Sequence, residues 1–129
     1  MDETKAGYVD NEKLYNEFVK WNEARQINPD AQMSNYIAQA ILDISKGLSK
    51  RFNFNRYTWK EEMIGDAVII CVKYVKNFDH VKYKNPHAYI SRLCEQSFRN
   101  RIKKEKREIA ARLKHFTKEV FDVEMIDAG

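Results

Sequence analysis

The chain has 129 residues, which is enough for one domain with a buried core. Glycine and proline are scarce and helix-forming residues are abundant, so we expect an all-α fold, a compact helical bundle, rather than a sheet of short strands. No apolar run is as long as a membrane span, and the first residues are polar and acidic, unlike a signal peptide. These features predict a soluble, intracellular protein with no membrane partner.

The net charge of +4 is unevenly distributed. Eight basic and two acidic residues fall within 99–114, a local balance of +6, so the remaining residues sum to −2. The basic residues are Arg99, Arg101, Lys103, Lys104, Lys106, Arg107, Arg112 and Lys114. A concentrated basic patch is typical of a surface that binds a polyanion, although most charge runs are only solvated helix faces.

The first two predicted helices have clear apolar stripes. In the first, from about Asn11 to Gln26, apolar residues recur at helical spacing and Asn28-Pro29-Asp30 ends the helix. The second spans 34–52, with Ser34 as the expected N-cap. The two stripes are Leu14, Phe18 and Trp21 in the first helix, and Ile37, Ile41, Ile44 and Leu48 in the second.

The third predicted helix starts at a capping box, Thr58-Trp59-Lys60-Glu61, and continues to about Asn77. It is apolar almost all round, which indicates a central helix buried on several sides. One face holds Ile64, Ala67, Val68, Cys71, Val75 and Phe78, and further apolar positions are Met63, Ile70, Val72 and Tyr74. Three acids, Glu61, Glu62 and Asp66, form a stripe beside Met63, which we expect to be exposed. This stripe is either a solvated face or a protein-docking surface with an apolar centre.

The fourth predicted helix begins with Asn85 as N-cap and Pro86 at its first position, and runs as far as Phe116. We expect Ile90, Cys94, Phe98 and Ile102 to face inward, and the residues after Phe116 are ambiguous. On the same helix, Tyr89 and Gln96 precede the basic run. An aromatic and an amide can contact bases while the cations hold phosphates, but a tyrosine at a helix start is more often a partly buried packing residue.

Enzymatic chemistry finds little support in the sequence. There is no glycine-rich phosphate loop, nucleophile elbow or metal-binding helix motif, and nothing indicates a pocket that would separate the pKa values of paired carboxylates. Cys71 and Cys94 are expected to be buried reduced thiols, without a close-spaced partner for a disulfide. His80, His87 and Cys94 share no ligand-type spacing. We therefore expect no catalysis, metal or cofactor.

Several long runs of the sequence resemble a known family. They are Gly47-Leu48-Ser49-Lys50-Arg51-Phe52-Asn53-Phe54, Trp59-Lys60, Glu62-Met63-Ile64, Asn77-Phe78-Asp79, Lys82-Tyr83-Lys84-Asn85-Pro86-His87-Ala88-Tyr89-Ile90 and Arg101-Ile102-Lys103-Lys104-Glu105, which together cover most of residues 40–109. Through these runs the chain resembles the late-transcription sigma factors of T-even-type phages. Less closely, residues 62–102 resemble region two of bacterial primary sigma factors, with which they can be aligned without a gap.

The resemblance implies a sigma factor that directs host core RNA polymerase to an AT-rich late promoter in the cytoplasm of an infected bacterium. Glu62 and Asp66 match acids that dock on a coiled coil of the largest polymerase subunit, and Tyr89 matches a tyrosine that stacks on a flipped adenine. Gln96 matches a glutamine that reads the upstream edge of the promoter element. The implied polymerase-binding residues are Glu61, Glu62, Met63 and Asp66. The implied DNA-binding residues are Tyr83, Lys84, His87, Tyr89, Arg92, Gln96, Arg99, Asn100, Arg101, Lys103, Lys104, Lys106 and Arg107.

The chain also departs from the family. Primary sigma factors have aromatic residues where this chain has Lys84 and Pro86, and a tryptophan pair where it has Arg92 and Leu93. A sliding clamp and a late coactivator are further implied partners, although the end of the chain holds no convincing copy of the clamp-binding motif. We divide the single expected domain, 1–129, into an N-terminal helix and linker (1–33), polymerase- and promoter-binding helices (34–116) and a C-terminal tail (117–129). Two alternatives remain: an autonomous helical DNA-binding regulator, and a transcription-machinery adaptor that does not contact DNA.

Overall fold

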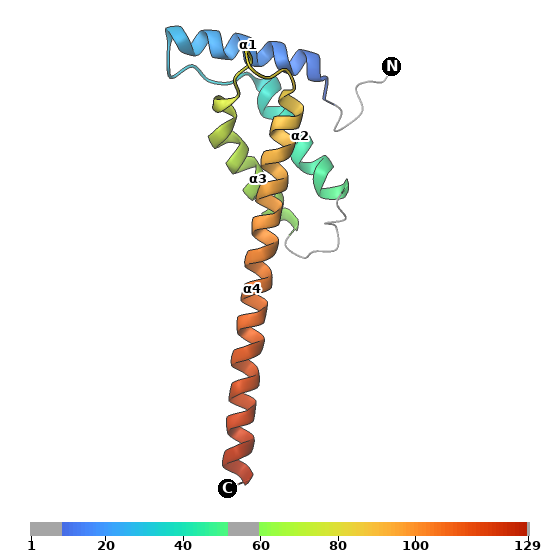
Figure 1. Cartoon of the computed structure of the whole chain (residues 1–129), viewed down its shortest axis with the longest axis vertical. Helices are drawn as coiled ribbons and strands as arrows, with labels where there is room; N and C mark the ends of the chain where they lie inside the picture. The colour runs from blue at the N-terminus through green and yellow to red at the C-terminus, as the bar shows by residue number, and fades with distance from the viewer. Residues whose placement is uncertain (1–8, 52–59, 129) are drawn as a thin grey trace. The chain divides into compact units, whose positions relative to one another are not determined.

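The structure, a computed structural model, describes residues 9–51 and 60–128, with side chains at 9–50 and 60–120. Within these residues it has four α-helices, a short 3-10 turn and no strand (Figure 1), so the all-α prediction is confirmed. The elements are α1 (Asn11–Ile27), α2 (Asn35–Arg51), α3 (Lys60–Tyr74), the 3-10 turn η2 (Val75–Asn77) and α4 (Pro86–Ala128). The chain divides into two compact units, Met1–Phe98 and Arg99–Gly129, and α4 contributes residues to both.

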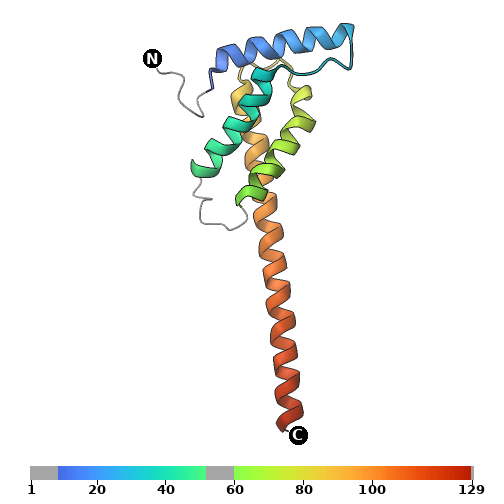
Figure 2. The same cartoon turned by 180° about the vertical axis from the view of Figure 1, so that it is seen from behind.

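In the first unit, α1 lies across one end of α2, α3 and the first turns of α4 (Figures 1 and 2). The apolar stripes predicted for the first two helices are buried, as are Ile90, Cys94 and Phe98 from α4. The largest fully buried side chains include Phe18, Phe78 and Phe98. Burial of such side chains is the main favourable contribution to folding, so this unit has a core of its own.

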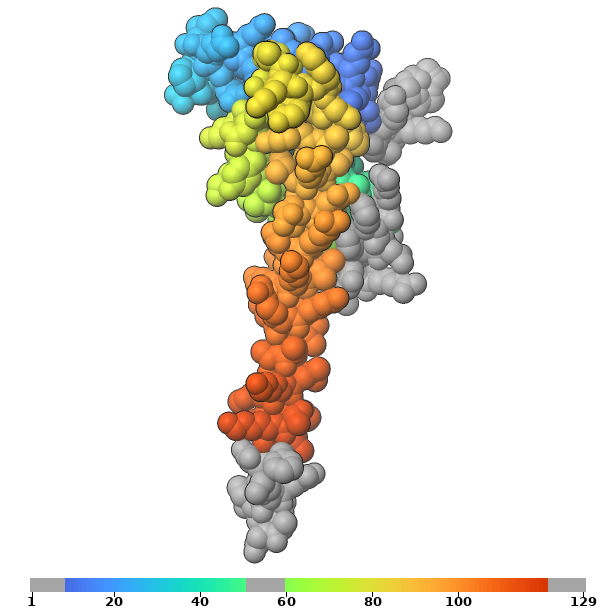
Figure 3. Space-filling model, in the orientation of Figure 1, coloured from blue at the N-terminus to red at the C-terminus, as the bar shows by residue number. Residues whose placement is uncertain are grey.

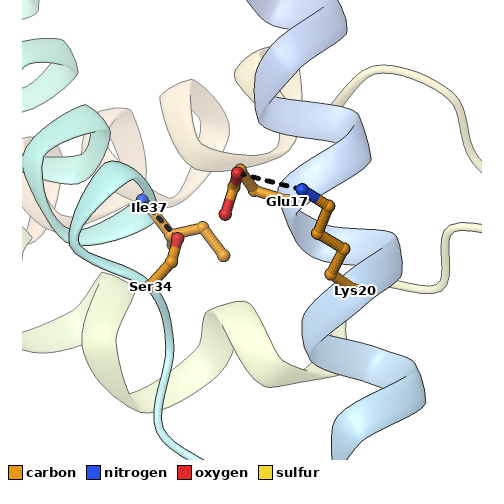
Figure 4. Close-up of polar contacts among 4 residues, drawn as sticks. All are labelled: Glu17, Lys20, Ser34 and Ile37. Carbon is orange, nitrogen blue, oxygen red and sulfur yellow. Dashed lines mark hydrogen bonds and ion pairs between the residues drawn. The ribbon is translucent and has the colours of Figure 1, made fainter.

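Polar side chains satisfy the first amides of three helices. The Asp10 carboxylate accepts hydrogen bonds from the amides of Glu12 and Lys13, and the Ser34 hydroxyl accepts one from the Ile37 amide at 3.3 Å (Figure 4). Ser34 is therefore the N-cap that the sequence predicted. Asn85 is likewise confirmed, because its side-chain oxygen accepts from the Ala88 amide at 3.0 Å. The capping box at Thr58 lies outside the described residues.

The starts of α1 and α4 are joined through two asparagines. Asn11 donates its side-chain amide to the side-chain oxygen of Asn85 at 2.9 Å, and its own oxygen accepts the His87 amide at 3.0 Å. Two of the first amides of α4 are thus satisfied, one from Asn85 and one from Asn11 across 76 positions of sequence. The position where α4 begins is therefore set by tertiary contact as well as by its own cap.

Further along α1, polar side chains hold the segment that leads into α4. The Tyr15 hydroxyl donates to the His80 carbonyl at 2.7 Å, and the Asn22 amide donates to the Phe78 carbonyl at 3.2 Å. The Arg25 guanidinium donates to the Lys76 carbonyl at 3.0 Å and lies over the ring of Trp21. Partial burial lowers the pKa of Arg25 from its usual value. These bonds hold the end of η2 and residues 78–80, which have no regular secondary structure, against α1.

Two expectations about the helices are wrong. The third helix is not buried on several sides: Met63, Ile64, Ala67 and Cys71 are buried, but Ile69, Val72 and Tyr74 are exposed. Only one face of α3 has helices to pack against in the described residues, and the pattern of apolar residues alone could not reveal this. The fourth helix does not stop near Phe116 but continues to Ala128, through the part of the tail that the sequence left ambiguous.

Cys71 and Cys94 are buried free thiols, as expected. Although they are distant in sequence, they lie next to each other in the core. Their sulfur atoms are 3.6 Å from each other, and the Ser45 hydroxyl is 3.3 Å from the Cys94 sulfur. The hydrogen bond between the thiols, together with burial, raises the pKa of Cys71. The close pairing joins α3 to α4 in the core and was invisible to an argument from spacing along the chain.

The second unit consists of the part of α4 from Arg99 onward. Its described side chains are exposed except for Arg101, Ile102 and Glu105, which are half-buried. Local side-chain contacts one turn apart support the helix: the ion pair of Arg101 with Glu105 at 3.0 Å, and the contact of His115 Nε2 with the Glu119 carboxylate at 3.1 Å. Among the described residues, no helix has the length and apolar character needed to cross a membrane.

Candidate nucleic-acid interface

A hollow of about 340 Å³ lies beside the start of α4 in the first unit. Its lining combines aromatic rings, cationic side chains and an amide: Phe78, Tyr83, Lys84, Asn85, Ala88, Tyr89 and Arg92. The segment before α4 and the beginning of that helix are at the surface in the space-filling view (Figure 3). The volume is at the lower end of the range for small-ligand pockets, which is suitable for a single flat ring system.

Tyr89 is held in a fixed position at this hollow. Its hydroxyl donates a hydrogen bond to the Tyr74 carbonyl at 3.1 Å, and its ring meets the buried ring of Phe78 edge-on, with centroids 5.5 Å apart. Partial burial, with a smaller effect of nearby Cys71, raises the pKa of Tyr89, so the phenol remains neutral and continues to donate. Tyr89 is thus a half-buried packing residue that also lines the hollow. From the sequence, packing and exposure to a ligand were weighed as alternatives for this residue.

Tyr83, Lys84 and Arg92 surround Tyr89 at the rim. Tyr83 and Arg92 are exposed, so an aromatic face and a guanidinium are both accessible to a ligand. The Lys84 ammonium is instead directed toward α1, where it donates to the Tyr15 hydroxyl at 3.1 Å and lies over its ring. The structure therefore brings the predicted residues Tyr83, Lys84, Tyr89 and Arg92 to one hollow. The ammonium of Lys84 is already occupied there.

Two other predicted DNA-binding residues of the first unit lie on α4 outside the lining of the hollow. His87 is half-buried, and its imidazole Nδ1 is 3.3 Å from the Ser91 hydroxyl. Gln96 is exposed two helical turns after Tyr89, so helical geometry places both residues on nearly the same side of α4. Arg92, between them, lies on this side too. An aromatic, a guanidinium and an amide thus follow one another along one face of the helix.

The remaining predicted DNA-binding residues belong to the second unit. Arg99, Asn100, Lys103, Lys104, Lys106 and Arg107 are exposed. Arg101 is different, since it is half-buried and paired with Glu105. Exposed cations on a rigid helix can contact phosphates without any sequence preference. The exposed cations of the second unit are therefore suited to contacts with the phosphate backbone of a nucleic acid rather than to reading its bases.

The expected docking stripe on α3 needs correction at its centre. Glu61 and Glu62 are exposed and Asp66 is half-buried, but Met63 is fully buried in the core and is not accessible to a partner. Around the helix axis Met63 is about 60° from Asp66 and about 40° from Ala67, so it packs inward with the apolar face rather than outward with the acids. The exposed apolar residues on the outer face are Ile69 and Val72, at 66% and 50% exposure.

Ile69 and Val72 were not among the predicted docking residues, although their spacing along the chain could have indicated a shared face. Glu62, Gly65, Ile69 and Val72 recur at intervals of three and four, which places them on one side of α3. Gly65 has open space where a side chain would begin, so it leaves the backbone accessible between the acids and the apolar pair. The outer face therefore combines acids near the helix start with an exposed apolar pair two turns on.

The described residues contain no group of three or more histidines, cysteines or acids that could hold a metal ion. Comparison with other proteins adds no identification. The sequence matches no model of a known protein family, and no curated protein matches it either.

Proposed function

We propose that the chain is a promoter-specificity subunit of the sigma type, which docks on core RNA polymerase through the outer face of α3 and captures an unpaired base in the hollow beside α4. The observation that carries this proposal is the lining of the hollow by Tyr83, Tyr89 and Arg92. The resemblance of residues 40–109 to phage late-transcription sigma factors supports it. The function needs no catalytic group and no ATP.

The energetics of base capture fit such a surface. A base stacked on an aromatic ring contributes about 1–3 kcal/mol, and extruding a base costs a few kcal/mol, least in AT-rich steps. Because Tyr89 is fixed by its hydrogen bond to the Tyr74 carbonyl and by packing against the Phe78 ring, little side-chain entropy is lost when a base binds. One aromatic hollow can therefore capture a melted base but cannot open a duplex alone. Docking on the polymerase supplies the remaining binding energy.

The test of base capture compares Tyr89→Ala with Tyr89→Phe in transcription with core polymerase. The template would be an AT-rich late-type promoter in supercoiled, linear and premelted form. If the ring stacks on a base, the alanine variant loses about 5- to 150-fold of its activity on the linear template, corresponding to about 1–3 kcal/mol. The loss should be smaller on premelted DNA. The phenylalanine variant should retain stacking, and equal losses on all three templates would remove Tyr89 from this role.

The test of polymerase docking uses one residue from each part of the outer face of α3. Ile69→Glu and Glu62→Lys should each reduce association with core polymerase in a pull-down, because one places a charge at the apolar contact and the other reverses a rim charge. Ile27→Glu is a matched control, since Ile27 is also exposed in the first unit but lies at the end of α1. Undiminished association of the Ile69 and Glu62 variants would contradict docking through this face.

Binding of the free protein to DNA separates the proposal from an autonomous regulator. The sigma-type function predicts weak binding by the isolated chain, because a small hollow must also bear the cost of melting. With about six phosphate contacts, a log–log plot of affinity against salt would have a slope of about −5. Tight, sequence-specific binding to duplex DNA would instead favour a regulator with a helix in the major groove. If the protein contacts DNA neither alone nor together with core polymerase, the result would favour the transcription-machinery adaptor.

A further inference from the structure

The second unit carries an apolar stripe that is separate from the basic residues at its start. Ile109, Leu113, Phe116 and Val120 are all exposed, between 40% and 65%. They recur at intervals of four, three and four residues, which is the spacing of the apolar seam in a two-stranded coiled coil. The opposite face of the same turns is charged, with Arg107, Lys114 and Lys118. This is an amphipathic helix whose apolar side is open.

We propose that this stripe, Ile109–Leu113–Phe116–Val120, pairs with the same stripe of a second copy of the chain in an antiparallel coiled coil. The stripe complements itself when one copy is reversed. Setting Leu113 of one copy against Phe116 of the other also sets Ile109 against Val120. A two-fold axis then repeats both contacts and gives four apolar layers.

The charges beside the stripe select the second copy and its direction. Arg112 and Glu119 each directly precede a stripe residue, so both lie on the same flank of the seam. In the antiparallel pair, Arg112 of each copy faces Glu119 of the other, which forms two ion pairs between opposite charges. In a parallel pair, Arg112 would face Thr117 instead, and these contacts would be lost. Glu119 now pairs with His115 on its own helix, at an exposed site where exchange of partners costs little.

The seam is short, so the predicted dimer is weak. Twelve residues, from Ile109 to Val120, extend about 17 Å along a helix, which is under two heptads of coiled coil. Association should therefore depend on concentration within the range of about 10 µM to 1 mM rather than being permanent. This pairing involves neither the hollow beside Tyr89 nor the outer face of α3, so it does not depend on the proposed function.

Sedimentation velocity of the full-length chain across this concentration range tests the proposal. The wild-type chain should shift from monomer to dimer, and Leu113→Glu should remain monomeric. Lys118→Glu is the matched control, because it changes an exposed charge on the opposite face of the same turns and should dimerise normally. A wild-type chain that stays monomeric throughout, or a dimer unaffected by Leu113→Glu, would overturn the proposal.

Charge exchange tests the direction. Arg112→Glu and Glu119→Arg should each weaken the dimer at least several-fold, because each places like charges opposite one another. The double variant restores opposite charges and should recover dimerisation. Circular dichroism confirms that each variant keeps its helix. Failure of the double variant to recover, with helix content unchanged, would overturn antiparallel pairing.

Discussion

Phe98 and Phe116 lie on the same helix, but one is 1% exposed in the first unit and the other is 65% exposed in the second. Up to Phe98, α4 is helical because its apolar side is buried against α2 and α3. Beyond that residue it depends on local terms, such as the Arg101–Glu105 pair, each worth a few tenths of a kcal/mol. Helices held by local terms alone are marginal in water. The contrast shows that one continuous helix can have two different sources of stability.

The most direct way to break this contrast is to delete the same ring at both positions. Phe98→Ala should lower the free energy of unfolding of the first unit by about 3–5 kcal/mol, because it removes buried apolar surface and leaves a cavity. Phe116→Ala should change it by less than about 0.5 kcal/mol. Urea titration at a concentration where the chain is monomeric measures both. A large loss for Phe116→Ala would mean that the second unit shares the cooperative core.

Proline at exposed alanines tests the same contrast through the backbone. Ala24→Pro, in α1, should lower the stability of the first unit by about 3 kcal/mol, because an interior proline removes a helical hydrogen bond and clashes with the preceding turn. Ala111→Pro should reduce the helical circular dichroism signal but leave the cooperative melting of the first unit in place. Equal shifts in melting temperature for the two variants would contradict separate sources of stability.

Within the first unit, the link between the starts of α1 and α4 should be measurable. Asn11→Ala removes the hydrogen bonds to Asn85 and to the His87 amide and should cost about 1–2 kcal/mol. Asn16→Ala, an exposed asparagine on the same helix, should cost little. Thermal unfolding of the two variants under the same conditions measures both losses of stability. Similar values for both would show that the link contributes nothing to stability.

The smallest expected losses of stability come from removing the two kinds of local contact shown in Figure 4, a helix cap and a surface ion pair. Ser34→Ala removes the cap of α2 and should cost about 1 kcal/mol. Lys20→Ala removes an ion pair with Glu17 of 3.8 Å, whose lysine is largely exposed, and should cost no more than about 0.5 kcal/mol. Denaturant midpoints measured at low and high salt test both values, since only the lysine variant should have a salt-dependent effect.

Much of the fold could be predicted from the sequence because its signals are local. Apolar spacing located the buried side of α1 and α2, and the short-range caps at Ser34 and Asn85 are confirmed. What could not be predicted depends on contacts distant in sequence. Asn11 is hydrogen-bonded to Asn85, and the thiols of Cys71 and Cys94 are in contact in the core. No local sequence pattern predicts either contact.

The candidate site was predicted in part for the same reason. Tyr83, Tyr89 and Arg92, three of the residues predicted to bind DNA, line one hollow. They come together because Tyr89 and Arg92 are about one turn apart on α4 and Tyr83 lies in the segment just before this helix.

On α3, periodicity located most of the buried face, since Ile64, Ala67 and Cys71 are buried as the pattern predicts. Because further apolar residues occur around the helix, the pattern did not show which of them lie outside this face. In the structure Met63 is buried in the core, whereas Ile69 and Val72 are exposed to solvent.

The paired thiols in the core have a practical consequence. Cys71 and Cys94 are the two cysteines of the chain, and both are fully buried. A water-soluble alkylating reagent can reach them only when α3 and α4 separate, so the rate of alkylation measures how often the first unit opens. Because the second unit contains no cysteine, its motions do not contribute to this signal. The native sequence thus carries its own reporter of core opening, with no label introduced.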